Sequence, residues 1–278
     1  PSVIRALNMA PETIIGQIRP DISDARVTED MGLKKKSFAG SWEGRFSTEE
    51  YEAVMNQRKD IPLTVDWEDG GSDVLSGAEI HKVIFDSQMP WMLSANGTIF
   101  TTEFEGVIPG ILKRWYSERK ELQKMLKKAK DAGNAAEIEY WDKRQLVKKI
   151  NLNSLYGAIL NPGCRFFDKR IGQSTTLTGR TIVKHMSAEV NRVITGEYDH
   201  VGEAMIYGDT DSCYFSGYPT LKNEIDAGNL PWGKDNVIKL YDQVCEAANE
   251  TFPEFMLTAF HCPKSRSDVI AAAREIVA

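Results

Sequence analysis

The stretch from Ala204 to Phe215, Ala-Met-Ile-Tyr-Gly-Asp-Thr-Asp-Ser-Cys-Tyr-Phe, places two acidic residues inside apolar sequence. The apolar residues on either side predict two short strands joined by an acidic bend. Alternate residues of an extended chain point to the same side, so the carboxylates of Asp209 and Asp211 are expected to converge. Adjacent carboxylates repel unless a cation lies between them, and such oxygen ligands suit Mg²⁺. The bend is therefore a candidate metal site, although acidic turns without a function also join strands.

Two long helices are expected upstream of the acidic bend. Apolar residues recur at helical spacing over residues 107–132, and a second helical segment covers residues 134–156. Because only Gly133 separates the two segments, they are expected to fold back as an antiparallel hairpin. At a rise of ~1.5 Å per residue, Arg119 on the first helix and Lys149 on the second lie roughly 20–25 Å from the turn. The two cationic side chains are therefore expected to reach the same place.

The second of these helices carries a polar face. Lys149, Asn153, Tyr156 and Gly157 are spaced so that they share one side of a helix. A face buried in a core would be apolar, whereas these side chains beside a glycine form a polar surface that a ligand can approach closely. Chance spacing is the competing explanation for this pattern taken alone.

Charge is distributed unevenly along the 278 residues. The formal net charge is −6 and the pI is about 5.4, which argues against a nucleic-acid-binding protein when the chain is taken whole. Residues 112–149, however, hold 12 basic and 6 acidic side chains, so a basic stripe lies in an acidic body. Such a stripe can neutralise phosphates locally, although a solvated helix face has the same composition. With 42% hydrophobic residues, the chain is expected to be globular.

Other segments predict further helices and short strands. Asn96-Gly97 between apolar residues predicts a two-residue β-hairpin turn. A helix over residues 173–195 is expected to be capped by Ser174 or Thr175. The remaining expectations are a short helix at residues 2–9, a turn at 10–12, a solvated loop at 34–36, a helix at 47–59 and a helix at 235–261.

Two blocks of sequence, in this order and spacing, point to a known family. Lys149-x-x-x-Asn153-Ser154-Leu155-Tyr156-Gly157 and, further on, Tyr207-Gly208-Asp209-Thr210-Asp211-Ser212 resemble motifs B and C of family B DNA polymerases. The start of the chain, residues 1–13, is similar to the sequence that follows motif A in that family. Within the family, residues 154–158 and 165–170 most resemble replicative polymerases of T-even-like tailed phages.

The resemblance implies an α+β fold with three parts. An antiparallel palm sheet, packed by helices, is expected to carry Asp209 and Asp211, and a two-helix fingers hairpin is expected to project from it. The implied parts are residues 1–106 as the N-terminal palm with an irregular insertion at about 20–90, residues 107–158 as the fingers, and residues 159–278 as palm truncated before the thumb.

The resemblance also implies a role for each matched residue. Asp209 and Asp211 match a catalytic, metal-binding carboxylate and its neighbour, and the intact enzyme is expected to use two Mg²⁺ ions. Arg119 and Lys149 match the cations that hold the triphosphate of the incoming dNTP, which suits charge neutralisation during nucleotidyl transfer. The positions implied to lie beside these cations and against the nascent base pair are Asn153, Tyr156 and Gly157.

The chain departs from the family pattern in two places. Family members usually have a second basic residue four positions after the arginine, where this chain has Gln123. Lys120 and Lys124 flank it and are the candidates to replace it. The motif A aspartate is expected a few residues before Pro1, outside this sequence, so the chain alone is expected to be inactive.

The function expected from the resemblance is that of a fragment of a viral DNA-directed DNA polymerase. Its expected partners are primer-template DNA, dNTP, and, for the full-length enzyme, a sliding clamp and replisome proteins, with no membrane. The expected location is the cytoplasm of an infected bacterial host. Two alternatives stay open: a non-catalytic nucleic-acid-binding module derived from a polymerase, and a metal-dependent glycosyltransferase, since those enzymes also use Asp-x-Asp.

Overall fold

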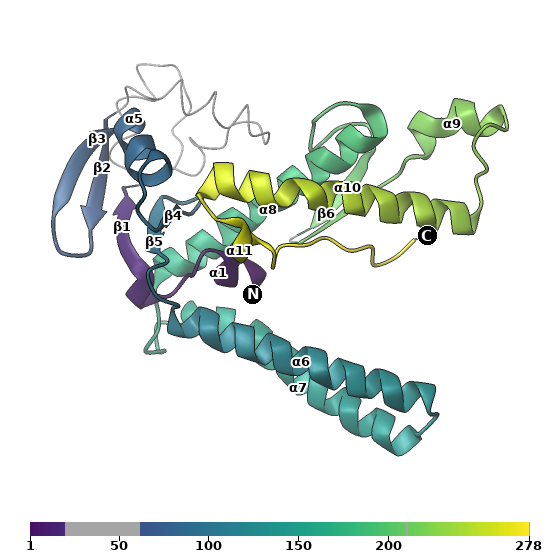
Figure 1. Ribbon diagram of the computed structural model, residues 1–278, viewed down its shortest axis with the longest axis horizontal. Helices are drawn as coiled ribbons and strands as arrows, with labels where there is room; N and C mark the ends of the chain where they lie inside the picture. The colour runs from purple at the N-terminus through teal and green to yellow at the C-terminus, as the bar shows by residue number, and fades with distance from the viewer. Residues whose placement is uncertain (20–61, 210, 278) are drawn as a thin grey trace.

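The structure is a computed structural model that describes residues 1–19, 62–209 and 211–277. Antiparallel sheets and long helices make up the expected α+β fold (Figure 1). The helix expected at 47–59 and the loop expected at 34–36 lie outside the described residues. No helix in the described part of the chain is both long and apolar enough to cross a membrane.

The described strands form two antiparallel sheets. The larger sheet has five strands in the order β3-β2-β1-β5-β4, and the smaller pairs β6 with β7. The hairpin expected at Asn96-Gly97 joins β4 to β5, and Gly97 has a φ of 83°. Its loop has three residues, 95–97, and not the expected two, because Ser94 pairs with Thr98. The strands are β1 (Ile14–Ile18), β2 (Pro62–Trp67), β3 (Ser72–Ser76), β4 (Trp91–Leu93), β5 (Thr98–Thr101), β6 (Met205–Asp209) and β7 (Ser212–Phe215).

The helices follow the expected positions closely. Those at 107–132, 134–156 and 235–261 are confirmed, with boundaries shifted by a few residues. The helices and helical turns are α1 (Ser2–Ala6), η1 (Pro11–Thr13), α5 (Gly77–His81), η2 (Lys82–Asp86), α6 (Val107–Asp131), α7 (Ala135–Ile159), α8 (Lys169–Thr195), α9 (Tyr218–Asp226), α10 (Lys234–Phe260) and α11 (Lys264–Ser267).

The start of α8 corrects the expected cap. The helix begins at Lys169, and the N-cap is Asp168, whose side chain accepts a hydrogen bond from the Arg170 amide at 2.8 Å. Ser174 therefore lies inside the helix. There its buried hydroxyl donates to Asn96 Oδ1 at 2.7 Å, which ties α8 to the β4–β5 turn.

The expectation that residues 20–90 are irregular is wrong for the part that the structure describes. Residues 62–86 form a β-hairpin followed by α5 and η2. The acidic run at 66–69 suggested a loop, but Leu63 and Val65 alternate along β2 and are buried. The strand forms because this face is apolar and packs in the core.

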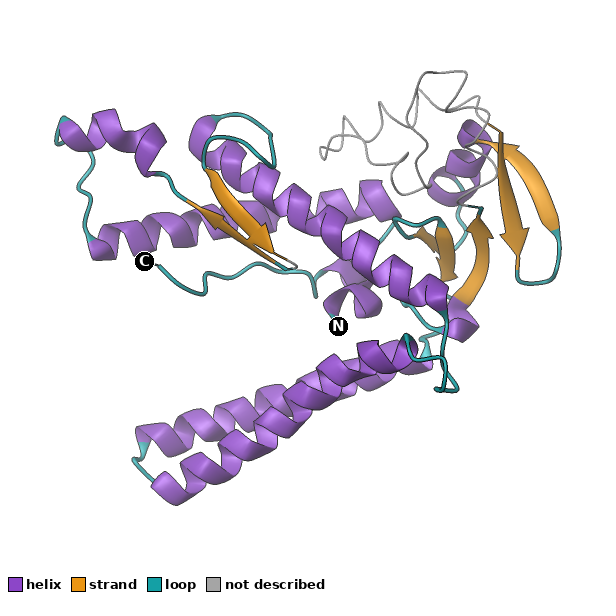
Figure 2. Cartoon of the chain, turned by 180° about the vertical axis from the view of Figure 1, so that it is seen from behind, coloured by secondary structure: helices purple, strands orange, loops and turns teal. Residues whose placement is uncertain are grey.

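The acidic bend does not lie on the larger sheet, which corrects the expectation of a single palm sheet carrying it. It joins β6 to β7, and Figure 2 shows this small hairpin well separated from the five-stranded sheet. Met205, Cys213 and Phe215 pack against a small core made by Val190 of α8 and by Val244 of α10 with Ala248. Two strands alone are marginally stable in water, so the helices supply the missing layer.

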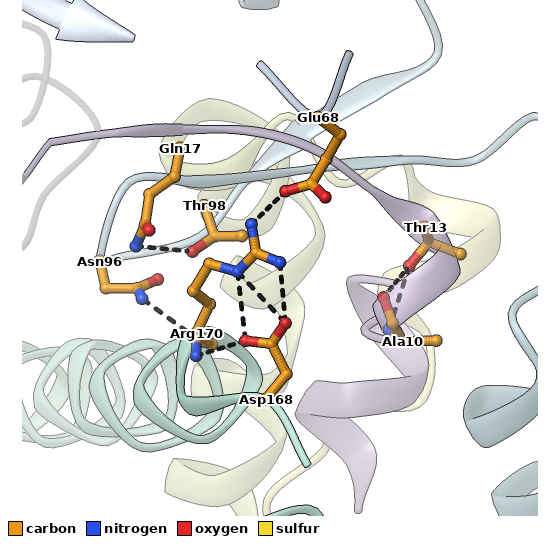
Figure 3. Close-up of polar contacts among 8 residues, drawn as sticks. All are labelled: Ala10, Thr13, Gln17, Glu68, Asn96, Thr98, Asp168 and Arg170. Atoms are coloured by element: carbon orange, nitrogen blue, oxygen red, sulfur yellow. Dashed lines mark hydrogen bonds and ion pairs between the residues drawn. The ribbon is translucent and has the colours of Figure 1, made fainter. Parts of the chain in front are cut away.

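An ion-pair bridge fixes the first turn of α8 to the larger sheet (Figure 3). The Arg170 guanidinium bonds Asp168 at 2.8 Å and also bonds Glu68, just beyond β2. These carboxylates, Asp168 before Glu68, raise the pKa of Arg170 above its ordinary value. Asn96 adds a hydrogen bond to the Arg170 carbonyl at 3.3 Å, so sheet and helix are joined through both side chain and backbone.

We predict that Asp66 on β2 titrates at an unusually low pH. Arg19 donates to both of its oxygens at 2.5 and 2.6 Å, and Arg19 followed by Ser72 lowers the pKa from 3.8 to about 2. The pair therefore stabilises the fold fully above pH 3.8, and this contribution is lost as the pH falls through about 2. Carboxyl-carbon NMR titration measures the midpoint. In Arg19→Met the midpoint should move back toward 3.8, and an unchanged midpoint would contradict the assignment.

Candidate functional site

The acidic bend presents its carboxylates at an exposed tip. Asp209 ends β6 opposite Ser212 of β7, and Asp211 follows in the turn, with both aspartates exposed. Tyr207 and Tyr214 are paired across the strands on the same face as Asp209, with ring centroids 5.9 Å apart. The carboxylates at the tip are therefore accessible to a charged ligand.

A buried asparagine fixes the loop that leads into β6. Asn191 of α8 accepts a hydrogen bond from the Ala204 amide at 3.0 Å and donates to the Glu197 carbonyl at 2.8 Å. A Cβ on Gly202 would lie 2.2 Å from the Asn191 amide, so the loop needs glycine there to pass so closely. The position of the acidic bend thus depends on α8.

The arm formed by α6 and α7 has a register that cross-helix contacts define. Arg119 Nε donates to Gln145 Oε1 at 3.4 Å, and Lys148 forms an ion pair with Glu118. Together the two contacts place Arg119 opposite about residues 145–147 of α7. The two cations predicted to reach the same place therefore lie within about one helical turn of each other along the arm.

Both cations nevertheless belong to one surface. Gln145, Lys149 and Asn153 are spaced by four residues and share a face of α7, and Arg119 reaches this face through its bond to Gln145. Lys149 and Asn153 are exposed, and their side chains form no hydrogen bond or ion pair within the described chain. This face is polar, cationic and open to an anion.

The remaining predicted residues lie at the base of α7. The Tyr156 hydroxyl is hydrogen-bonded to Thr176 Oγ1 of α8 at 2.6 Å, which fixes the tyrosine against the body of the protein. Gly157 is exposed, and a Cβ built on it would meet nothing within 4 Å. The surface at Gly157 is thus open in this structure.

The N-terminal segment interacts electrostatically with the acidic bend and contacts the arm. Asp211 acts on the Pro1 amine, whose pKa is lowered by desolvation and next by Arg5, while Asp211 opposes this shift. Arg5 lies over the Tyr116 ring of α6 at 4.9 Å, and Lys120 lies over the same ring at 5.4 Å. Both ribbon views place the N-terminus between the β6–β7 hairpin and the arm (Figures 1 and 2).

Sequence reasoning missed Arg5 and Tyr116 as members of this site. The two residues lie far apart in the sequence, and neither stands in a motif that signals an aromatic–cation contact. Burial lowers the pKa of Arg5, partly offset by Tyr116 and then by Glu105. Arg5 and Tyr116 meet because α1 packs against α6.

The structure also separates the two lysines that flank Gln123. Lys124 bonds Glu121 at 2.7 Å, so its charge is paired. Lys120 instead lies over Tyr116, on the side of α6 that contacts Arg5. Of the two lysines, Lys120 is thus the one that contacts Tyr116, whereas Lys124 is paired with Glu121.

The donor set at the bend fits a hard divalent cation in part. Asp209 and Asp211 offer carboxylate oxygens, the ligands that Mg²⁺ prefers. Among the described residues, no group of three or more His, Cys, Asp or Glu side chains is placed to hold a metal ion. The bend therefore supplies part of a coordination shell, and substrate oxygens or another carboxylate would complete it.

An acidic bend linked through a short helix to a cationic arm is an arrangement suited to polyphosphate chemistry. The family model for DNA polymerase family B matches residues 1–225. The chain belongs to this family. Membership leaves the glycosyltransferase hypothesis without support, because the Asp-x-Asp is now accounted for by the polymerase motif.

Relatives come from several kinds of organism. The chain is 31% identical over 115 residues to a DNA polymerase from Pyrococcus glycovorans, covering 41% of this chain and 14% of the relative. It is 35% identical over 127 residues to the DNA polymerase delta catalytic subunit of Oryza sativa subsp. japonica, covering 45% and 11%. It is 28% identical over 229 residues to the DNA-directed DNA polymerase of Escherichia phage RB69, covering 78% and 24%. The chain thus spans a quarter or less of the length of each.

We predict that Gly157→Ala stabilises this chain. The new methyl group meets open space, and alanine is favoured over glycine in a helix by about 0.5–1 kcal/mol. Gly196→Ala is the matched control and should destabilise the chain by about 1 kcal/mol or more, because Gly196 ends α8 with a φ of +85°. Urea unfolding of both variants measures the difference. A loss of stability in Gly157→Ala would show that the surface is not open.

Proposed function

We propose that this chain is the nucleotidyl-transfer region of a DNA-directed DNA polymerase. In the proposed reaction the primer 3′-oxygen attacks the α-phosphorus of a dNTP, a new P–O bond forms, and pyrophosphate leaves. The observation that carries the proposal is the family match over residues 1–225, which includes the blocks 149–157 and 207–212. The N-terminal segment supports it, because it interacts electrostatically with Asp211 and carries Arg5, which lies over Tyr116 of the arm.

In this proposal the arm binds the triphosphate. Arg119 and Lys149 lie on one face within about a turn of each other, so both can reach the same chain of phosphates. Their charges would neutralise the phosphates as negative charge develops on the leaving pyrophosphate. Lys120 is the better candidate for the second lysine position, because Lys124 is paired with Glu121.

The acidic bend would hold magnesium in this proposal. Asp209 and Asp211 are the residues that would hold it, and bound Mg²⁺ would supply Lewis acidity toward the primer hydroxyl and the phosphates. The exposed position of both carboxylates leaves room for the primer end. A further aspartate is proposed to come from a segment preceding Pro1, because residues 1–13 resemble the sequence that follows motif A in the family. Without that residue the chain is proposed to be inactive.

The base of α7 would face the nascent base pair. Gly157 presents no side chain and a Cβ there would meet nothing, so a flat base pair can approach the helix backbone. Tyr156 is held on α8 through Thr176, which gives this surface a fixed wall. Asn153 lies between these residues and Lys149 on the same face. Primer-template DNA and dNTP are thus the proposed ligands.

A viral origin is the finer part of the proposal. The phage RB69 relative aligns over 78% of this chain, and a relative from Red sea bream iridovirus is 30% identical over 135 residues, covering 48% of this chain and 13% of the relative. A phage polymerase would act in the cytoplasm of its bacterial host, with a sliding clamp and replisome proteins. Sequencing the DNA on either side of the coding region would test this origin, because phage genes would surround it.

We predict that Asp209→Asn abolishes primer extension. The test protein is this chain joined to an upstream segment that contains motif A. Loss of one metal-binding carboxylate removes several kcal/mol of transition-state stabilisation, so extension should fall by on the order of 10³-fold. The rate is measured on a labelled primer with dNTP and Mg²⁺.

Asp226→Asn, at the exposed end of α9, is the control and should extend like the parent. If Asp209→Asn also extends like the parent, the metal assignment is wrong. If the parent binds primer-template but never extends it, the non-catalytic nucleic-acid-binding alternative is favoured instead.

We further predict that Arg119→Ala and Lys149→Ala weaken nucleotide use without weakening DNA binding. Each hydrogen bond to a charged group contributes about 1.5–3 kcal/mol, so KM for dNTP should rise by roughly 10- to 100-fold. Steady-state kinetics in the extended protein measures KM, and fluorescence anisotropy measures the Kd for primer-template. Lys143→Ala is the control, since Lys143 is paired with Glu139 on exposed α7. Equal effects in all three variants would contradict the assignment.

A further inference from the structure

A wholly buried asparagine fastens the chain that enters α6. Asn8 has no exposed surface and a φ of 54°, a left-handed backbone conformation that residues other than glycine rarely adopt. Its amide donates to the carbonyls of Thr101 and Phe104, both at 2.8 Å, and its carbonyl accepts from the Gly106 amide at 3.0 Å. One side chain thus satisfies three backbone groups in the segment before the helix.

A glutamate completes the attachment at the first residue of α6. Glu12 Oε1 accepts a hydrogen bond from the Val107 amide at 2.6 Å, and the N-cap residue Gly106 has no side chain to do so. A carboxylate at a helix N-terminus is also favoured by the helix dipole. Glu12 therefore caps α6 from a different segment of the chain.

The segment that carries Asn8 and Glu12 is itself tightly built. Thr13 Oγ1 donates to the carbonyls of Asn8 at 2.5 Å and Ala10 at 2.9 Å, and the Ala10 contact is drawn in Figure 3. A Cβ on Gly106 would lie 2.8 Å from that of Ala10, so the Gly106 backbone packs closely against the Ala10 methyl group. Residues 8–13 together with 101–107 are called the α6 joint below.

A small tilt at the α6 joint would displace residues far along the arm. At ~1.5 Å per residue, Arg119 lies about 18 Å from Val107, so a tilt of about 10° at the joint would displace it by about 3 Å. Displacements of about 1 Å can cost a reaction on the order of 10²-fold. The base of α7 is fastened separately, through Tyr156 to Thr176 and through the Ile159 carbonyl to the Asp168 amide.

We propose that the α6 joint is the fixed pivot of the arm, and that Asn8 and Glu12 are positioning residues for the cations on it. The statement about the pivot stands on the contacts above. Its consequence for nucleotide rests on the proposed function. Neither residue touches the proposed ligands: each acts by holding the start of α6.

The first experiment measures the orientation of the arm in this chain. Spin labels introduced as unnatural amino acids at Lys130 and Lys239 report the distance between the arm and α10. Glu12→Ala and Asn8→Ala should broaden or shift that distance distribution, while Glu12→Gln, which keeps the acceptor oxygen, should restore most of the parent distribution. Glu12 is exposed, so its variants test the pivot even if Asn8→Ala fails to fold.

Asn96→Ala is the matched control. Asn96 is also buried and makes three hydrogen bonds, to Ser94, Ser174 and Arg170, but it lies at the β4–β5 turn. It should lower stability and leave the distance distribution unchanged. The proposed pivot is contradicted if the distance distribution of Glu12→Ala equals that of the parent. It is also contradicted if Asn96→Ala broadens that distribution as much as Glu12→Ala does.

The second experiment measures nucleotide use in the protein extended with a motif A segment. Glu12→Ala should raise KM for dNTP by about 10-fold with an unchanged Kd for primer-template, and Glu12→Gln should stay within about 3-fold of the parent. A parent-like kcat/KM for dNTP in Glu12→Ala, or equal losses in Glu12→Ala and Glu12→Gln, would overturn the positioning role. If the parent incorporates no nucleotide while the label distances still shift in Glu12→Ala, the proposed function fails and the pivot stands.

Discussion

Two carboxylates on a two-stranded hairpin cannot hold their position without support, and this constraint shapes the rest of the structure. The aspartates repel each other, and an isolated hairpin is marginal in water. The apolar side of β6 and β7 therefore packs on Val190, Val244 and Ala248, while Asn191 fixes the loop before β6. The length of α8 follows from this requirement, because one end secures the bend and the other, through Arg170, is tied to the larger sheet.

The segment 1–13 is the second element on which the arrangement depends. It lies between the acidic bend and the arm. Arg5 lies over Tyr116 and Asn8 holds the start of α6, while Asp211 of the bend acts on the segment electrostatically. A segment of so few residues can do this because Ile4 and all of residues 6–10 are buried, so that its backbone is fixed by the core. The same N-terminal segment therefore holds the arm in place relative to the acidic bend.

The sequence predicted the periodic elements and the two motif blocks, but not the contacts between them. The long helix α6 was predicted from its apolar spacing, and Gly133 marks the turn before α7. β2 was missed because an acidic run begins at its end, at Asp66, although Leu63 and Val65 alternate as a strand requires. The separation of the acidic bend from the larger sheet was also missed, because a pairing partner cannot be read from a strand's own residues. Arg5 and Asn8 act across long sequence separations, for which no local pattern exists.

The candidate site residues on the arm do little for the stability of the described fold, and this separates them from the core. Lys149 and Asn153 form no side-chain hydrogen bond or ion pair within the described chain, and Gly157 sits in a helix where alanine would be favoured. Unpaired lysine and asparagine side chains are ordinary on an exposed helix face, whereas a glycine inside a helix is a departure from the best folding choice. Such departures are expected where a surface serves a ligand. Gly157 shares a face of α7 with Lys149 and Asn153, and its position is thus an argument for a binding surface that is independent of motif resemblance.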